Sequence, residues 1–142
     1  FLVGLVLATG VGCDGPAPRA RAQRIAASAH LIGGPKAIGQ IGDYLLENDQ
    51  VRIVIHDKGP GRVNTLYGGT LVDADLVRPG GAGGTAGNDQ VAEIVPAFMF
   101  EVIEPDDVRV TRDGSAGGPA EVTVRGRGSD LLQLAGGVGE RG

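Results

Sequence analysis

The stretch VRVTRDGSAGGPAEVTVRG, residues 108–126, decides the fold that this chain is expected to adopt. On both sides of a glycine-rich centre, apolar residues alternate with polar ones, and this period of two is typical of a half-buried β-strand. The centre, DGSAGG, is rich in residues that tolerate a positive φ, as a hairpin connection requires. The stretch therefore predicts an antiparallel hairpin with an inward face of four valines: Val108, Val110, Val122 and Val124.

Three further segments show the same short period. In YLLENDQVRIVIHD, residues 44–57, the turn-forming pair Asn48-Asp49 separates two apolar runs and predicts a second hairpin. The segments YGGTLVDADLV, residues 67–77, and PAFMFEVI, residues 96–103, each predict one strand. The residues expected to share a face are Val51, Ile53 and Ile55 in the hairpin, then Val72, Ala74 and Leu76, and finally Phe98, Phe100 and Val102.

The composition agrees with short strands joined by turns. Glycine accounts for 26 of the 142 residues, well above its usual share of about 7 %. Tryptophan is absent, so the core is expected to consist of Val, Ile and Leu. We therefore expect an all-β fold, an antiparallel β-sandwich over residues 31–142. Because a final strand is expected after SDLLQLAGG, residues 129–137, and none follows, we expect the sandwich to be incomplete at its C-terminus and to belong to a larger protein.

The chain begins with FLVGLVLATGVG, residues 1–12, which is apolar and ends in small residues. As a helix it would reach about 18 Å, too short for a hydrocarbon core of about 30 Å, but it suits the hydrophobic region of a signal peptide. The small residues followed by Cys13, the only cysteine, resemble the lipobox of bacterial lipoproteins. The resemblance implies that the Cys13 thiol receives diacylglycerol and becomes the mature N-terminus. An ordinary signal peptide with an incidental cysteine is the alternative.

Residues 14–30, DGPAPRARAQRIAASAH, follow the cysteine and contain few large apolar residues. Such a segment has little apolar surface to bury, so we expect a flexible tether. The predicted organisation is a signal-peptide hydrophobic region at residues 1–12, the lipidated cysteine and tether at 13–30, and the β-sandwich domain at 31–142.

The charge of the predicted domain bears on its partners. Three of the 13 basic residues and one of the 17 acidic residues precede residue 31, which leaves 10 basic and 16 acidic residues in the domain. An acidic body without a basic patch is not expected to bind nucleic acid. The expected partners are the membrane, through the lipid on Cys13, and downstream domains of the same polypeptide. The expected location is the bacterial cell envelope, facing the periplasm or the cell exterior.

Three carboxylates form a candidate for a weak cation site. Asp73 and Asp75 are two residues apart on one strand, so their side chains are expected about 6–7 Å apart on one face. Asp89 lies beyond the glycine-rich loop that follows this strand, and a set of carboxylate oxygens suits calcium. The spacing matches no calcium-loop motif, and a solvated strand face is the alternative interpretation.

The histidines predict no catalytic centre. His30 and His56 are the only two, and His56 is expected at the surface, where a strand ends. Two histidines and a lipid-bound cysteine provide neither a nucleophile with its base nor a four-ligand zinc site. We therefore predict no catalytic residue, metal or cofactor, and the chain itself is not expected to be an enzyme.

Four segments follow one another between residues 33 and 126: GGPKAIGQIGDYLLENDQVRIVI, YGGTLVDADLVRP, NDQVAEIVPAF and VRVTRDGSAGGPAEVTVRG. Their order resembles the N-terminal region of large secreted bacterial lipoproteins, some of which carry a PHP-type metallohydrolase domain further downstream. LENDQVRIV followed by GGTLV also resembles, more loosely, the opening strands of galactose-mutarotase-like sandwiches. A PHP-type site is built on His-x-His, which is missing here, so the resemblance implies metal ligands outside this chain.

Three functions follow from these observations. The first is a lipid-anchored, exported β-sandwich that acts as a non-catalytic binding or interaction domain of a larger cell-envelope protein. The second is the leading domain of a metal-dependent hydrolase or carbohydrate-active enzyme whose catalytic residues lie downstream. The third is a carbohydrate-binding module, which would need an exposed aromatic platform.

Overall fold

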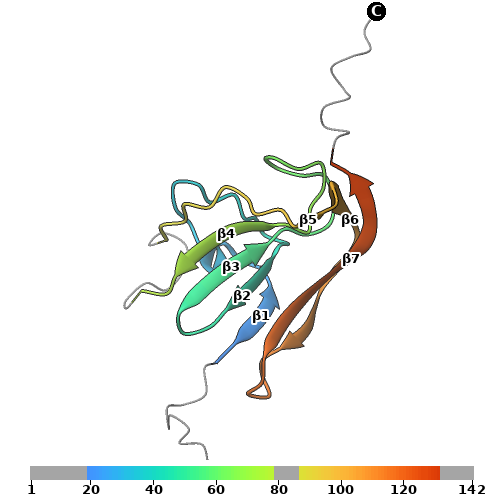
Figure 1. The fold of residues 1–142 in the computed structure, drawn as a ribbon. Coiled ribbons are helices and arrows are strands. Elements are labelled where there is room, and N and C mark those ends of the chain that lie inside the picture. Colours follow the sequence, from blue (N-terminus) through green and yellow to red (C-terminus); the bar gives the residue numbers. More distant parts are fainter. Residues whose placement is uncertain (1–18, 79–86, 132–142) are drawn as a thin grey trace, which may run out of the picture.

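The computed structural model describes residues 19–78 and 87–131, which form an all-β, sandwich-like fold of two antiparallel sheets (Figure 1). The fold class predicted from the sequence is therefore confirmed. The first sheet has the order β1-β2-β3-β4, with β1 Arg21–Arg24, β2 Tyr44–Glu47, β3 Val51–Ile55 and β4 Leu71–Leu76. The second has the order β5-β6-β7, with β5 Ala97–Phe98, β6 Glu101–Asp113 and β7 Ala120–Asp130. A single 3-10 turn, η1 Ser28–His30, is the one helical element of the described ranges.

The β2–β3 hairpin forms where the sequence predicts it. Tyr44 pairs with Ile55 and Glu47 with Arg52. The side-chain oxygen of Asn48 accepts hydrogen bonds of 2.8 Å from the backbone N–H groups of Gln50 and Val51, so Asn48 closes the turn locally. The turn chemistry read from the sequence therefore sets the register of this hairpin.

The boundary predicted between tether and domain is wrong. Residues 21–24 form β1, which pairs antiparallel with β2, and Ala22 and Ile25 are buried. Ile25 also donates its backbone N–H to the carbonyl of Asp43 at 2.7 Å. Isolated apolar residues between arginines give little signal in the sequence, but pairing with β2 satisfies their backbone and buries the two apolar side chains. The described domain thus includes part of the segment that we assigned to the tether.

The β6–β7 hairpin forms where residues 108–126 predict it. Val108 pairs with Val124 and Val110 with Val122. Gly114 and Gly117 adopt φ values of 80° and 79° in the connecting turn, a conformation that side chains other than glycine disfavour. Val108 is buried, whereas the other three valines of the predicted inward face are only half-buried. The second sheet is therefore only partly covered on its inner face.

The single strand predicted over residues 96–103 is instead a tight hairpin. Ala97 pairs with Val102 and Phe98 with Glu101, so Met99 and Phe100 are the two turn residues. Their φ values are 51° and 65°, as a two-residue connection of the primed type requires. Phe98, Phe100 and Val102 consequently do not share one face of a strand. The sequence offers no Asn-Gly or Asp-Gly pair there, which is the usual signal for such a turn.

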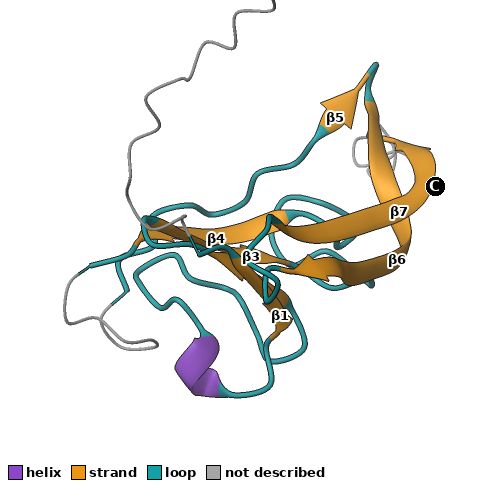
Figure 2. Ribbon diagram, turned by 90° about the horizontal axis from the view of Figure 1, so that it is seen from below, coloured by secondary structure: helices purple, strands orange, loops and turns teal. Residues whose placement is uncertain are grey.

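The fully buried apolar cluster lies against one face of the first sheet. It consists of Ile25, Ile32, Leu45, Val54 and Val72, with Leu31 and Ile38 packed against it. The loop that carries η1 supplies several of these residues, and Figure 2 shows this loop at the first sheet, apart from β6 and β7. The opposite face of the first sheet carries Tyr44, whose hydroxyl reaches β6. The first sheet is thus covered by loops on one side and partly by the second sheet on the other.

Candidate functional site

Asp73, the first carboxylate of the predicted cation site, is buried and bonds to backbone. Its carboxylate accepts hydrogen bonds from the backbone N–H groups of Ile38 at 2.8 Å and Gly39 at 3.0 Å. Burial raises the pKa of Asp73, the two backbone hydrogen bonds lower it, and the nearby carboxylates of Asp89 and Asp43 raise it further. A β-bulge in β3–β4 pairing accompanies the burial of both Val72 and Asp73. The solvated face that we considered as the alternative is therefore wrong at Asp73.

Asp75 bonds to a different part of the chain. Its carboxylate accepts hydrogen bonds of 2.6 and 2.8 Å from the guanidinium of Arg78 and one of 2.7 Å from the backbone N–H of Asn88. The hydrogen bonds from Arg78 are the largest cause that lowers the pKa of Asp75 to about 2. Asp75 is thus an ionised partner of Arg78 and an anchor for the loop at residue 88.

Asp89 is fully buried beside β4. One of its carboxylate oxygens accepts hydrogen bonds from the backbone N–H groups of Ala74 at 2.8 Å and Val91 at 3.0 Å. The other oxygen is buried and has no hydrogen-bond partner among the residues that the structure describes. Across the described ranges 19–78 and 87–131, no three His, Cys, Asp or Glu side chains are grouped as metal ligands would be. Asp73, Asp75 and Asp89 therefore hold loops against β4 rather than converge on one point.

A buried ion pair, Asp43–Arg62, lies at the start of β2. The Asp43 carboxylate accepts hydrogen bonds from the backbone N–H groups of Gln40 and Asp57 and from both terminal nitrogens of the Arg62 guanidinium. Asp43 is 1 % exposed, so its charge is compensated almost entirely by these four donors. The pair fixes the loop of residues 57–70 against the first sheet.

His56 is buried next to this ion pair, so the surface position predicted for it is wrong. Burial is the main cause that lowers the pKa of His56, and the charge of Arg62 lowers it further. Asp43, Glu93 and Asp57 oppose this shift less strongly. The Nδ1 atom of His56 has no hydrogen-bond partner within the described part of the chain. The alternation of the strand does not predict this burial, because the residues that cover His56 belong to the loop that follows the strand.

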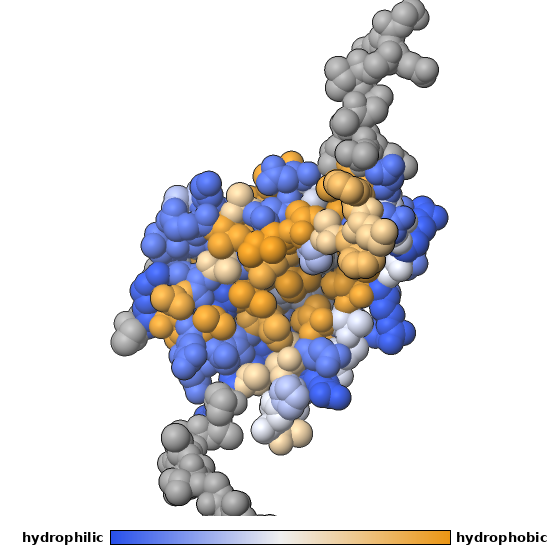
Figure 3. Space-filling model, in the orientation of Figure 1, coloured by the Kyte–Doolittle hydropathy of each residue, from blue (hydrophilic) through white to orange (hydrophobic). Residues whose placement is uncertain are grey.

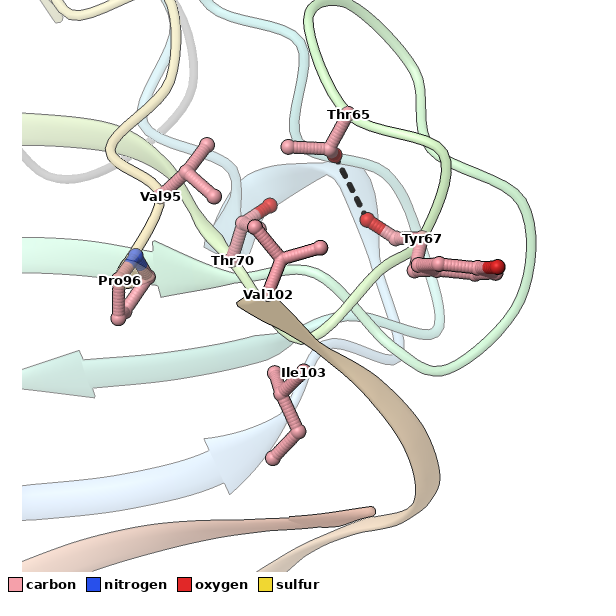
Figure 4. A pocket seen from close by; sticks show the side chains of 7 residues that line it. All are labelled: Thr65, Tyr67, Thr70, Val95, Pro96, Val102 and Ile103. Atoms are coloured by element: carbon pink, nitrogen blue, oxygen red, sulfur yellow. Dashed lines mark hydrogen bonds between the residues drawn. The ribbon is translucent and has the colours of Figure 1, made fainter. Parts of the chain in front are cut away.

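Glu93 completes the polar network under the 57–70 loop. Its carboxylate accepts hydrogen bonds from the hydroxyls of Thr65 at 3.0 Å and Thr70 at 2.7 Å, and from the backbone N–H of Asn64 at 2.8 Å. Beside it lies a small gap with no room for a water molecule (Figure 4). The gap is lined by Thr65, Tyr67, Thr70, Val95, Pro96, Val102 and Ile103. This region holds structure together and offers no space for a substrate.

A shallow polar depression of about 370 Å³ opens on the other side of Tyr67. The guanidinium of Arg127 donates hydrogen bonds of 3.0 and 2.9 Å to the carboxylate of Glu104, and the hydroxyls of Tyr67 and Ser129 are 3.1 Å apart. The Glu104 carboxylate also lies beside the Tyr67 hydroxyl, so the charged and hydroxyl groups of this depression form one polar network.

The described surface is most unusual at the β5–β6 turn, which we call the apolar tip and which consists of Phe98, Met99 and Phe100. These side chains are 78, 79 and 71 % exposed. Figure 3 shows a broad apolar area across this side of the molecule, and Val51 and Leu76, paired across β3 and β4, are exposed as well. Contiguous exposed apolar surface of this kind marks interaction sites on soluble domains. Three consecutive apolar residues were visible in the sequence, but the assignment to one strand hid their exposure.

Cys13, the predicted lipidation site, lies outside the described residues. Within residues 19–78 and 87–131, no helix has the length and apolar character needed to cross a bilayer. No family model, curated protein or solved structure matches the chain.

Proposed function

We propose that this chain is a non-catalytic interaction module of a larger cell-envelope protein, exported and held to the membrane by lipid on Cys13. The anchor rests on the sequence, in which an apolar segment ending in small residues runs directly into the only cysteine. The non-catalytic role rests on the buried polar groups, because Asp43, Asp73 and Glu93 direct their oxygens to backbone and structural side-chain donors.

The observation that carries the interaction role is the apolar tip. Two successive residues other than glycine hold positive φ values there, which costs of order 1–3 kcal/mol per residue in unfavourable cases. The same turn could be made by Asn-Gly at a lower conformational cost. The tip therefore keeps large apolar side chains in water at a position where small polar residues would be more stable. Contact with a partner explains both features.

The position of the tip fits an anchored module. The Cα of Gly114, in the β6–β7 turn, lies close to the carbonyl of Ala20, so the chain enters the domain beside this turn. The apolar tip precedes β6 at its other end (Figure 1). β6 has 13 residues, which at about 3.3 Å per residue separates the two ends by roughly 40 Å. An anchor at the N-terminal side would thus leave the tip available to a partner away from the membrane.

The anchor is tested by metabolic labelling with a fatty-acid probe in a bacterial host. The chain should incorporate the probe and sediment with membranes, and Cys13→Ala should lose both properties. Ser115→Ala, a small change in the exposed β6–β7 turn, is the matched control and should keep them. Membrane association of Cys13→Ala at the level of the unmodified chain would refute lipid anchoring.

The interaction role is tested with a photo-cross-linking amino acid at position 98 in the apolar tip. The same residue placed at position 115, in the turn at the other end of β6, is the control. A discrete cross-linked product at position 98 and none at position 115 is expected. Equal labelling at both positions, or none at position 98, would count against the tip as the contact surface.

A further inference from the structure

The outer edge of β7 is a second feature of the described residues that requires a partner. β7 is the last strand of the order β5-β6-β7, and no strand of the described ranges pairs with its outer side. The strand is 11 residues long, contains no proline, and the register shifts of the hairpin fall on β6. Natural proteins usually protect such an edge, because its free N–H and C=O groups pair readily with another strand.

The edges of β6 and β4, unlike that of β7, are protected within the described residues. On β6, the carbonyls of Asp106 and Val108 accept hydrogen bonds from Lys58 and Tyr44. On β4, the backbone of Leu71 exchanges hydrogen bonds with Ile94. The backbone N–H of Ala74 is bound by the Asp89 carboxylate. Within the described residues, no comparable side chain or loop donates to or accepts from the backbone of residues 120–126 on this outer side.

We infer that β7 pairs antiparallel with β7 of a second copy of this chain, across a twofold axis at Thr123. This register places Glu121 opposite Arg125 of the second copy, and the symmetry repeats the pair on the other side of the axis. Arg125 is exposed and has no hydrogen bond or ion pair within the described part of the chain. A register centred on Arg125 would instead oppose two arginines, which is unfavourable.

The inner face of β7 supports the same register. Val122 and Val124 are half-buried, and pairing about Thr123 places each of them opposite the other valine of the second copy. Each valine would therefore contact a valine of the second copy rather than a charged side chain. On the outer face, the Thr123 hydroxyl lies 2.9 Å from that of Thr111, so two threonines of the two copies would meet in a polar row. The pairing would join the two hairpins into one continuous sheet.

The pairing is tested by oxidative cross-linking of the full chain in cells that express it. Opposite residues without mutual hydrogen bonds in antiparallel strands have Cα atoms about 4.5 Å apart, within the range for a disulfide. Thr123→Cys is therefore expected to give a disulfide-linked dimer well above the background that Cys13 gives in the unmodified chain. Thr111→Cys is the matched control, because three strand spacings of about 4.8 Å would separate the two copies of residue 111.

Charge exchange tests the register in the Thr123→Cys background. Arg125→Glu, which breaks no contact of the described domain, should lower the dimer yield about three- to tenfold, since both symmetric pairs become repulsive. Adding Glu121→Arg should restore the yield. Arg109→Glu on β6 makes the same charge change away from the edge and should leave the yield unchanged. A Thr123→Cys yield at background, or equal yields for the single and double charge variants, overturns the inference. These outcomes do not depend on lipid anchoring or on the apolar tip.

Discussion

The hydroxyl of Tyr44 donates a hydrogen bond of 2.7 Å to the backbone carbonyl of Val108, which joins β2 to β6 across 64 residues of sequence. Burial is the main cause that raises the pKa of Tyr44, so its hydroxyl remains a protonated donor at neutral pH. Because the two sheets share no β-ladder, this bond is one of the few polar links between them.

Tyr44→Phe should lower the free energy of unfolding by about 1–2 kcal/mol, because the substitution removes a buried hydrogen bond to a carbonyl. Urea denaturation should show a lower midpoint with an unchanged slope. Tyr67→Phe is the control, since the Tyr67 hydroxyl is half-buried and meets the side chains of Ser129 and Glu104 instead of a buried backbone carbonyl. Equal losses of stability in the two variants would show that the Tyr44–Val108 hydrogen bond contributes no more to the stability than the contacts of the Tyr67 hydroxyl.

Ile25→Ala should lower the free energy of unfolding by about 2–4 kcal/mol, because Ile25 is 1 % exposed in the main apolar cluster. The measurement separates a core residue from a residue of a flexible tether. Ile41→Ala makes the same change at a side chain that is 61 % exposed, and should cost less than about 0.5 kcal/mol. If Ile25→Ala leaves the free energy of unfolding unchanged, residues 14–30 form the flexible tether that the sequence predicts.

His56 should make the stability depend on pH in a defined window. Its pKa in the folded protein lies below the ordinary value of 6.5, so the unfolded chain binds the proton more readily. The stability is therefore complete above about pH 6.5 and falls as the pH decreases toward the pKa of the folded state, by at most about 1.4 kcal/mol per pH unit. Urea titrations between pH 5 and pH 7.5 measure this slope.

His56→Asn should reduce that slope, whatever it does to the stability at neutral pH. His30→Asn is the matched control, because it keeps His56 and should keep the decline. An unchanged slope in His56→Asn would assign the pH dependence to other groups.

The double substitution Met99→Asn and Phe100→Gly should raise the free energy of unfolding by about 1 kcal/mol, since it replaces two strained residues by the preferred turn pair. The same variant should lose the cross-linked product expected at position 98, so stability and interaction would change in opposite directions. Gly117→Ala is the control in the opposite direction, because it introduces a side chain at a positive φ where the native residue is glycine. At a φ of 79° with open space around the added carbon, it should destabilise by about 1 kcal/mol. A destabilised double variant would show that the tip residues serve the fold itself.

Local patterns in the sequence were enough to predict β2, β3, β4, the β6–β7 hairpin and two of the turns, but not β1. The alternation around Asn48 and around the glycines at 114–118 depends on neighbouring residues alone, because side-chain direction in a strand has a period of two. The same patterns correctly indicated the antiparallel partners of Val108 and Val110. They did not reveal the tight turn at Met99 and Phe100, since no glycine or asparagine marks it.

Which face of each strand is covered was decided only by the tertiary structure. Val51, Ile53 and Ile55 were predicted to share a face, yet the fully buried residue of β3 is Val54 on the other side. Alternation states which residues share a face, but burial depends on what the distant loop of residues 25–38 brings against it. Asp73 was likewise placed in the interior by a remote segment, because the backbone N–H groups of Ile38 and Gly39 supply the donors that a buried carboxylate needs. His56 is covered by the loop that follows β3, which the alternation within the strand does not predict.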